Sequence, residues 1–168
     1  MSMRIETSRL VITDFRSDMA KAVHLGSLDA DTRRFLPDEV FETEAIATDV
    51  IADLMDCYES TDGPFVHPIL ADGQYAGYVQ LVPIESGWEI GYHVVKEMTG
   101  RGYATEAVQA FLPVMMDRLG INRVEGICDA ENTASIRVLE KCGFTRTYEG
   151  VALYHGEMKP VVKTIYAK

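Results

Sequence analysis

The segment MTGRGYATEA, residues 98–107, joins a predicted strand to a predicted helix. Gly100 and Gly102 flank Arg101, and helix-forming residues follow from Ala104. The first N–H groups of a helix have no partner inside it, and they lie at the positive end of the helix dipole. Glycine has no Cβ atom, so an anion can approach the backbone closely. The segment is therefore either a structural turn or a site for phosphate groups.

Two common glycine motifs for nucleotide binding can be tested against this segment. A P-loop needs Lys and then Ser or Thr after its second glycine, whereas Gly102 is followed by Tyr103 and Ala104. A Rossmann fingerprint needs a third glycine after the first strand of a βαβ unit, and this segment lacks that glycine and follows several strands. Both motifs are excluded. Thr105 adds a hydroxyl donor, and Tyr103 is expected to pack its ring against the sheet.

The chain on both sides of the segment is rich in predicted strands. Short apolar runs of branched and aromatic residues are typical of strands. These runs span residues 9–15, 63–70, 75–84, 87–95 and 122–129, and two further strands are predicted in the tail from residue 144. Asp72 and Gly73 can supply the positive φ angles of a tight hairpin turn. The pattern predicts a sheet with hairpins at both ends.

Helical periodicity occurs between these strands. Over residues 104–119, apolar side chains recur at spacings of three and four. A second helix is predicted over residues 132–144, with Asn132 or Thr133 as its N-cap. The region between the first strand and about residue 60 reads as mostly helical, with a break at Pro37. Strand-helix-strand units between hairpins predict an α/β or α+β fold with a mixed sheet.

The composition fits a globular chain with one domain over residues 1–168. The formal net charge of −10 argues against a nucleic-acid partner, which would require a basic face. No apolar run approaches the roughly 20 residues that cross a bilayer, and the first residues lack the apolar core of a signal peptide. Neither the cysteines (Cys57, Cys128 and Cys142) nor the histidines have metal-ligand spacing, so no metal is expected. Free thiols indicate a reducing, cytoplasmic location.

The negative charge is concentrated in the first half of the chain. Residues 1–72 hold 15 Asp and Glu against 6 Lys and Arg, whereas residues 73–168 hold 11 against 10. A solvated acidic surface that aids solubility explains this asymmetry, and so does a cationic partner of the N-terminal half. The charge alone leaves both explanations open.

Three motifs in a fixed order carry a more specific signal. EIGYHVV (89–95), GRGYATEA (100–107) and NTASIRVLEKCGF (132–144) resemble the GCN5-related N-acetyltransferase (GNAT) superfamily, and most closely its ribosomal-protein-alanine N-acetyltransferase (RimJ/RimL-type) branch. The resemblance runs from about Glu6 to Ala167. It implies an acetyl-CoA-dependent N-acetyltransferase. It also implies the family's fold, a largely antiparallel sheet with a splayed parallel strand pair at the cofactor site and about four flanking helices.

The resemblance also implies which residues bind acetyl-CoA. Val94 and Val95 would offer backbone groups to the pantetheine arm, and a backbone N–H near Tyr92 to Val94 would donate to the thioester oxygen. Asn132 would bond the pantetheine amide or serve only as an N-cap. Arg137 would reach the phosphates or remain an exposed helix residue. The diphosphate would be held by the loop residues Gly100, Arg101, Gly102, Tyr103, Ala104 and Thr105.

Acetyl transfer from a thioester to an amine needs a base, a donor for the carbonyl oxygen and a thiolate that leaves. A thiol pKa of ~8.5 makes the leaving group tolerable, so direct attack suffices without a covalent enzyme intermediate. Glu89 is the favoured base, and the alternatives are a carboxylate paired with an arginine such as Arg123 and a carboxylate merely exposed at the start of the strand. His93 lies on the same side of the strand and is either a second catalytic candidate or a structural histidine. Ser135 either donates to the departing sulfur or bonds only the backbone.

In the family that the sequence resembles, the acceptor enters opposite the cofactor, over the first helices and the final hairpin. Much of that region is acidic here, so a cationic primary amine is expected, with Asp38, Glu39 and Glu42 available to its ammonium group. Protein N-termini and small cationic amines both fit, and either a monomer or a homodimer is expected. Two other interpretations stay open: a non-catalytic acyl-CoA-binding module, and an interaction protein whose glycine loop is only structural.

Overall fold

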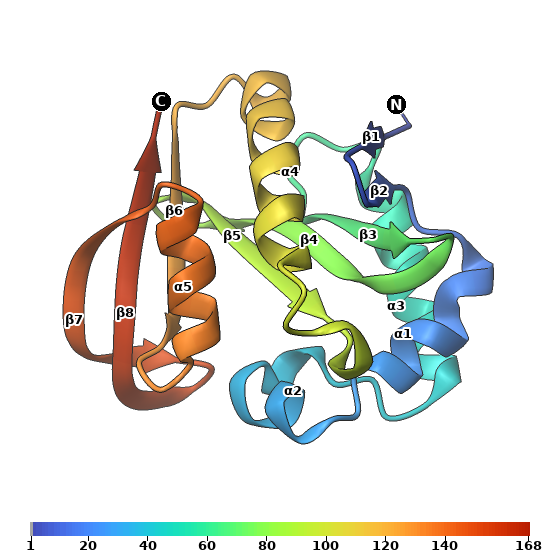
Figure 1. Ribbon diagram of the computed structural model, residues 1–168, viewed down its shortest axis with the longest axis horizontal. Coiled ribbons are helices and arrows are strands. Elements are labelled where there is room, and N and C mark those ends of the chain that lie inside the picture. Colours follow the sequence, from blue (N-terminus) through green and yellow to red (C-terminus); the bar gives the residue numbers. More distant parts are fainter. Residues whose placement is uncertain (1) are drawn as a thin grey trace.

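Figure 1 shows the computed structural model of the protein, which describes residues 2–168. Eight strands form one sheet in the order β1-β2-β3-β4-β5-β6-β8-β7. Neighbouring strands are antiparallel except β5 and β6, which are parallel. The predicted fold class, a largely antiparallel mixed sheet with one parallel pair, is confirmed. The strands are β1 (Arg4–Glu6), β2 (Leu10–Thr13), β3 (Phe65–Ala71), β4 (Gln74–Ile84), β5 (Gly87–Val94), β6 (Arg123–Asp129), β7 (Thr145–Tyr154) and β8 (Glu157–Ala167).

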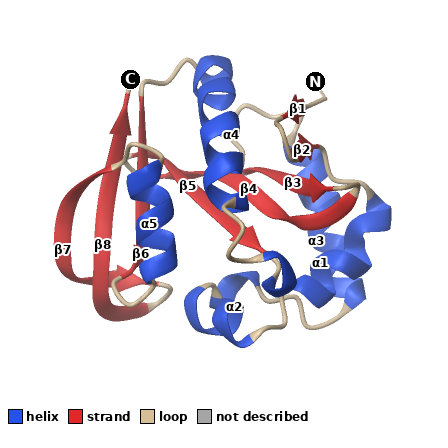
Figure 2. Ribbon diagram, viewed as in Figure 1, coloured by secondary structure: helices blue, strands red, loops and turns tan. Residues whose placement is uncertain are grey.

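Residues 2–168 contain five α-helices and three short 3₁₀ helices, one α-helix more than the predicted four. In Figure 2, α4 and α5 cover one face of the sheet, α1 and α3 cover the other, and α2 lies beyond the end of β5. None of these helices is both long and apolar enough to span a membrane. The helices are η1 (Ser17–Met19), α1 (Ala20–Gly26), α2 (Ala30–Phe35), η2 (Pro37–Glu39), α3 (Glu44–Cys57), η3 (Lys96–Met98), α4 (Tyr103–Leu119) and α5 (Thr133–Lys141).

Two groups of buried side chains hold the helices against the sheet. The larger group lies under α4 and α5 and includes Phe111, Leu139 and Val79. The smaller group lies under α1 and α3 and includes Ile51 and Tyr78. Tyr78 and Val79 are consecutive in β4 but belong to different groups, because successive side chains of a strand point to opposite faces. Burial on both faces therefore fixes which β4 and β5 side chains face α3 and which face α4.

The sheet opens between β5 and β6. Only Glu89 and Glu125 pair between these strands, whereas β4 and β5 pair from Gly77–Val94 to Ile84–Gly87. The edge of β5 beyond Glu89 therefore has no strand partner, although it lies in the middle of the sheet. Backbone groups in such a position require another partner. The opening is the feature of the fold that creates the candidate site.

Several local predictions agree with the structure. The β3–β4 hairpin has positive φ at Asp72 (51°) and Gly73 (75°). The long helix begins at Tyr103, one residue before its predicted start. Asn132 is the N-cap of α5, where its side-chain oxygen accepts from the N–H of Ser135 at 3.2 Å. Strand β1 is absent from the prediction, because three residues are too few to show alternation.

Candidate active site

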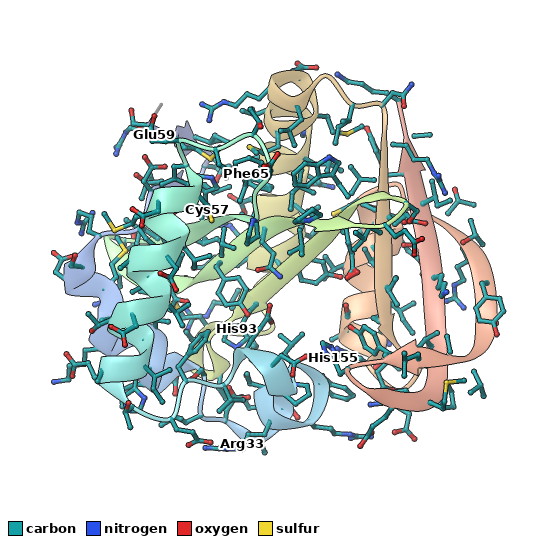
Figure 3. All side chains as sticks on the ribbon, turned by 180° about the vertical axis from the view of Figure 1, so that it is seen from behind. Arg33, Cys57, Glu59, Phe65, His93 and His155 are labelled. Carbon is teal, nitrogen blue, oxygen red and sulfur yellow. The ribbon has the colours of Figure 1, made fainter. Side chains whose placement is uncertain are left out.

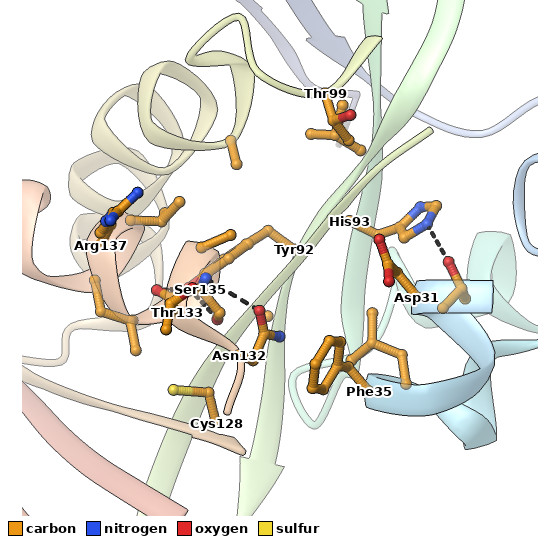
Figure 4. Close-up of a pocket in the computed structure, with 18 of the residues that line it drawn as sticks. Asp31, Phe35, Tyr92, His93, Thr99, Cys128, Asn132, Thr133, Ser135 and Arg137 are labelled. Atoms are coloured by element: carbon orange, nitrogen blue, oxygen red, sulfur yellow. Dashed lines mark hydrogen bonds between the residues drawn. The ribbon is translucent and has the colours of Figure 1, made fainter. Parts of the chain in front are cut away.

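A cavity of about 660 Å³ opens where β5 and β6 separate. Its walls are β5, β6, the neighbouring part of β4, the loop before α4, the first turn of α4, the helices α5 and α2, and the turn between β7 and β8. The volume lies within the range of small-molecule and cofactor sites, about 300–1,000 Å³. Figure 4 shows its two sides, with Arg137, Ser135, Asn132, Tyr92 and Cys128 on one and His93, Asp31 and Phe35 on the other.

The loop before α4 presents a row of free backbone donors to this cavity. Within residues 2–168, the N–H groups from Gly100 to Thr105 donate to no other group. Gly100 and Gly102 have φ angles of 77° and 80°, in the left-handed region that favours glycine. A Cβ atom added at Gly100 would meet no heavy atom within 4 Å, so the space beside the loop is open. These donors at a helix start suit an anion such as a diphosphate.

Residues from the start of the chain hold this loop in place. Glu106, in the first turn of α4, accepts from Thr7 Oγ1 at 2.6 Å and from Arg9 Nε at 2.7 Å. Arg9 also donates to the carbonyl of Arg101 at 2.8 Å and stacks over the ring of Tyr103. Burial acts to raise the pKa of Glu106, but the hydrogen bonds from Thr7 and Arg9 outweigh it and lower the pKa. No local sequence pattern predicts this clamp, because Arg9 and Glu106 lie 97 positions apart.

The backbone of β5 offers further donors. Val95 donates its N–H to the carbonyl of Ala76 at 2.8 Å, which corrects the prediction that it faces the cofactor. Because N–H groups alternate between the two edges of a strand, those of Tyr92 and Val94 point toward β6. That edge is unpaired beyond Glu89. The backbone of Val94, and not that of Val95, is free for a ligand in the cavity.

Of the two cations predicted to reach the phosphates, Arg137 lines the cavity and Arg101 does not. Arg101 does not line the cavity, and its Nη2 atom lies 3.4 Å from the carbonyl oxygen of Glu97. Arg137 and Lys141 of α5 line the cavity, and neither forms an ion pair within residues 2–168. Figure 4 shows Arg137 on the same side of the cavity as Ser135. Two free cations therefore lie across the cavity from α2, on the α5 side.

Three polar residues from β5 and α5 meet in the cavity. Tyr92 Oη lies 2.8 Å from Ser135 Oγ and 2.9 Å from the carbonyl oxygen of Ser135. The side-chain nitrogen of Asn132 has no partner within residues 2–168. Burial raises the pKa of Tyr92, so its phenol stays protonated at neutral pH and can donate to Ser135. Sequence analysis identified only the backbone of Tyr92, because no local pattern links its hydroxyl to a residue 43 positions later.

Glu89 lies where β5 meets β6, is partly buried and lines the cavity. Arg123, the alternative partner, lies 3.5 Å from Glu125 instead, and no cation pairs with Glu89 within residues 2–168. Burial raises the pKa of Glu89 to about 7, and the negative charges of Glu125 and Glu39 add to the rise. A carboxyl group whose pKa lies near neutrality has the properties of a general base.

His93 also lines the cavity but is engaged by α2. Its Nε2 atom lies 2.9 Å from Thr32 Oγ1, and the same hydroxyl donates to Asp29 at 2.6 Å. The ring stacks on Tyr78 and is 9% exposed. Burial lowers the pKa of His93, although the charge of Asp29 opposes this effect. The contacts with Thr32 and Tyr78 favour the structural alternative for His93, although its Nδ1 atom has no hydrogen-bond partner within residues 2–168.

The three acidic residues predicted for the acceptor lie in different surroundings. Glu39 lines the cavity. Asp38 lies 2.8 Å from Nδ1 of His155, in the turn between β7 and β8. Glu42 accepts from Arg33 through both oxygens, at 2.6 and 3.2 Å, and does not line the cavity. The ion pair with Arg33 therefore corrects the predicted role of Glu42, and only Glu39 faces the cavity directly.

The thiols bear on the kind of chemistry that the site supports. Burial raises the pKa of both Cys128 and Cys142 to about 11. Protonated thiols are poor nucleophiles, so a covalent enzyme intermediate on either sulfur is disfavoured at neutral pH. Among residues 2–168, no three His, Cys, Asp or Glu side chains come together as a metal site.

Comparison with known proteins defines the class to which this fold and site belong. Residues 9–145 match the family model of the acetyltransferase (GNAT) domain. The chain belongs to the GNAT family and is an N-acetyltransferase. The splayed strands, the glycine loop and the α4 start are thus features of an enzyme.

Individual relatives agree with this assignment. The uncharacterized N-acetyltransferase YnaD of Bacillus subtilis is 28% identical over 148 residues, which cover 86% of this chain and 84% of YnaD. The crystal structure of a GNAT-family acetyltransferase from Bacillus anthracis matches with a TM-score of 0.83 and 26% identity over 98% of both chains. RimL, a ribosomal L7/L12 α-N-protein acetyltransferase solved with coenzyme A, matches with a TM-score of 0.84 and 20% identity over 98% of both chains. The likeness to RimL is one of fold.

Proposed function

We propose that this protein transfers the acetyl group of acetyl-CoA to a primary amine, either a protein N-terminus or a small cationic amine, with residues 1–168 acting as one catalytic domain. The observation that carries the proposal is the row of free N–H groups from Gly100 to Thr105 beside the opening between β5 and β6. Backbone donors at a helix start bind phosphate oxygens and add the favourable field of the helix dipole.

The residues present fit the coenzyme. The loop from Gly100 to Thr105 would hold the diphosphate, and Arg137 and Lys141 are available to the remaining phosphate. The free edge of β5 at Val94 would pair with the amide groups of the pantetheine arm, beside the unpartnered side-chain nitrogen of Asn132. When bound, acetyl-CoA supplies an acetyl thioester whose carbonyl carbon is open to an amine.

The chain's own residues supply the remaining chemistry. Glu89 would take the proton from the acceptor's ammonium group, directly or through water, since its pKa lies at about 7. The N–H of Tyr92 points to the opening and would donate to the carbonyl oxygen as negative charge develops there. Ser135 would donate its hydroxyl hydrogen to the leaving sulfur while Tyr92 Oη donates to Ser135.

Ser135→Ala is expected to lower turnover about fivefold and to leave the affinity for coenzyme A within twofold of the wild type. The effect is modest, because a thiolate with a pKa of ~8.5 is already a tolerable leaving group. Single-turnover rates measure the step directly. Tyr92→Phe removes the donor to Ser135 and should give a loss of similar size, and unchanged rates in both variants would reject this role.

The acceptor class rests on charge and on fold. Glu39 and Glu89 face the cavity, which supports a cationic amine. The fold that this chain shares with RimL supports a place in the RimJ/RimL-type branch, whose acceptors include a ribosomal protein in the case of RimL.

The three free cysteines support a reducing, cytoplasmic location. The net charge of −10 argues against a nucleic-acid partner.

An acceptor screen followed by thiol release tests the proposed function. It includes peptides with different first residues and a set of small cationic amines, each with acetyl-CoA. Acetyl transfer to any primary amine, with one thiol released per amide formed, is the expected result. Saturable binding of acetyl-CoA without transfer would indicate a binding module instead. No measurable binding would indicate that the glycine loop is only structural.

A further inference from the structure

A second cavity adjoins the first, and the proposed chemistry does not use it. It has a volume of about 380 Å³ and lies on the face of the sheet that α3 covers. Figure 3 views the molecule from this side, with α3 in front of the strands. Apolar side chains make most of its wall, among them Phe41, Val50, Ile51, Leu54, Val66 and Val82. A partly enclosed space with such walls suits an apolar group.

The two cavities share part of their lining. Glu39 and Gln80 line both of them. Gln80 pairs with Gly91 of β5, and two residues further along, on the same face of the sheet, Val82 pairs with Glu89. The Cβ atoms of such cross-strand neighbours are ~4.5–5.5 Å apart. Glu89 and Val82 are therefore neighbours on this face of the sheet, and the apolar wall at Val82 begins beside the candidate base.

Negative charge marks the boundary between the cavities. The carboxylate of Glu39 accepts from Tyr78 Oη at 2.6 Å and from Gln80 Nε2 at 2.9 Å, and these two bonds fix its position. Asp38 adds a second carboxylate to the lining of the apolar cavity. No lysine or arginine is found among the described residues that line it. An ammonium group is thus favoured at the boundary, and apolar atoms are favoured beyond it.

We propose that the second cavity holds the apolar side group of the acetyl acceptor, so that the preferred acceptors are primary amines carrying an aromatic or branched aliphatic group two or three bonds from the nitrogen. This inference rests on the proposed function, because it takes the amine near Glu89 as the acceptor. It narrows the substrate class, since charge alone admits polar amines equally. Acceptor amines with polar side groups are disfavoured, because the apolar wall would leave the hydrogen-bonding atoms of those groups without partners.

Titration calorimetry on the protein saturated with coenzyme A tests the inference with 2-phenylethylamine and ethanolamine. The aromatic amine is expected to bind at least tenfold more tightly. Val50→Phe fills the cavity from α3 and should bring the two affinities close together. The control is Met55→Phe on the same helix, where the side chain is 37% exposed and lines neither cavity, and the preference should persist. If Val50→Phe does not fold, Leu54→Phe fills the same cavity.

The outcomes separate this inference from the proposed function. Equal affinity of the two amines, or a preference that survives in a folded cavity-filled variant, would overturn the inference. Thiol release with the same amines is measured in parallel. A binding preference without acetyl transfer to these amines or to any acceptor of the screen would support the cavity and reject the proposed function. Equal transfer to both amines would support the proposed function and reject the cavity as the determinant of acceptor choice.

Discussion

Replacing Gly102 by valine is expected to weaken the binding of coenzyme A at least a hundredfold. Gly102 has φ 80° and ψ 14° at the N-cap of α4, a left-handed conformation that costs an L-residue about 1–2 kcal/mol. A branched side chain relieves this strain by moving the loop, and the N–H groups that follow then lose their common direction. Loss of two hydrogen bonds to charged oxygens, at about 1.5–3 kcal/mol each, accounts for the expected factor.

Gly120→Val is the matched control for this substitution. Gly120 has φ 64° at the other end of α4, and an added Cβ atom there would meet no heavy atom within 4 Å. Its strain should lower the melting temperature to a similar extent, while titration calorimetry should give a coenzyme affinity within twofold of the wild type. Tight binding by Gly102→Val, or an equal loss in Gly120→Val, would show that the loop geometry does not determine affinity.

Glu89→Gln is expected to lower turnover at pH 7 about a hundredfold while the affinity for coenzyme A changes less than twofold. Glutamine keeps the size of the side chain but cannot accept the proton, and a general base contributes about 10²–10⁴ in rate. Steady-state thiol release gives the turnover, and calorimetry gives the affinity. A loss smaller than threefold would exclude Glu89 as the base.

The pH dependence of turnover tests the same residue independently. Because the pKa of Glu89 is raised to about 7, wild-type turnover should increase as the pH rises through 7 and the carboxylate forms. Glu89→Gln should lose this increase. Glu125→Gln should move it to lower pH, because the charge of Glu125 helps to raise the pKa of Glu89. The same increase in Glu89→Gln would assign the titration to a different group.

Features with local signals could be predicted from the sequence. Asp72 and Gly73 specify the hairpin through positive φ, and the spacing of apolar residues specifies α4. Gly100 and Gly102 specify the left-handed turns of the loop, because other residues rarely adopt them. The opening between β5 and β6 was accessible only through the family resemblance, since strand pairing depends on contacts that a single segment does not encode.

Contacts between distant segments explain where the site prediction failed. Pairing with β4 decides which N–H groups of β5 point toward β4 and which point toward β6. The direction of the Val95 N–H could therefore not be predicted from composition alone. Glu42 was predicted from charge, but Arg33 of α2 binds it after folding. The clamp of Arg9 on Glu106 likewise depends on the packing of β2 beside α4. Sequence patterns thus locate a glycine loop at a helix start more readily than the side chains that orient it.

Backbone amide NMR with added coenzyme A tests most directly whether the loop before α4 binds the diphosphate. We expect the largest amide chemical-shift changes at residues 100–105, and we expect pantetheine, which lacks the diphosphate, to produce no comparable changes there. Unmoved amides at residues 100–105 when the protein is saturated with coenzyme A would contradict this mode of binding.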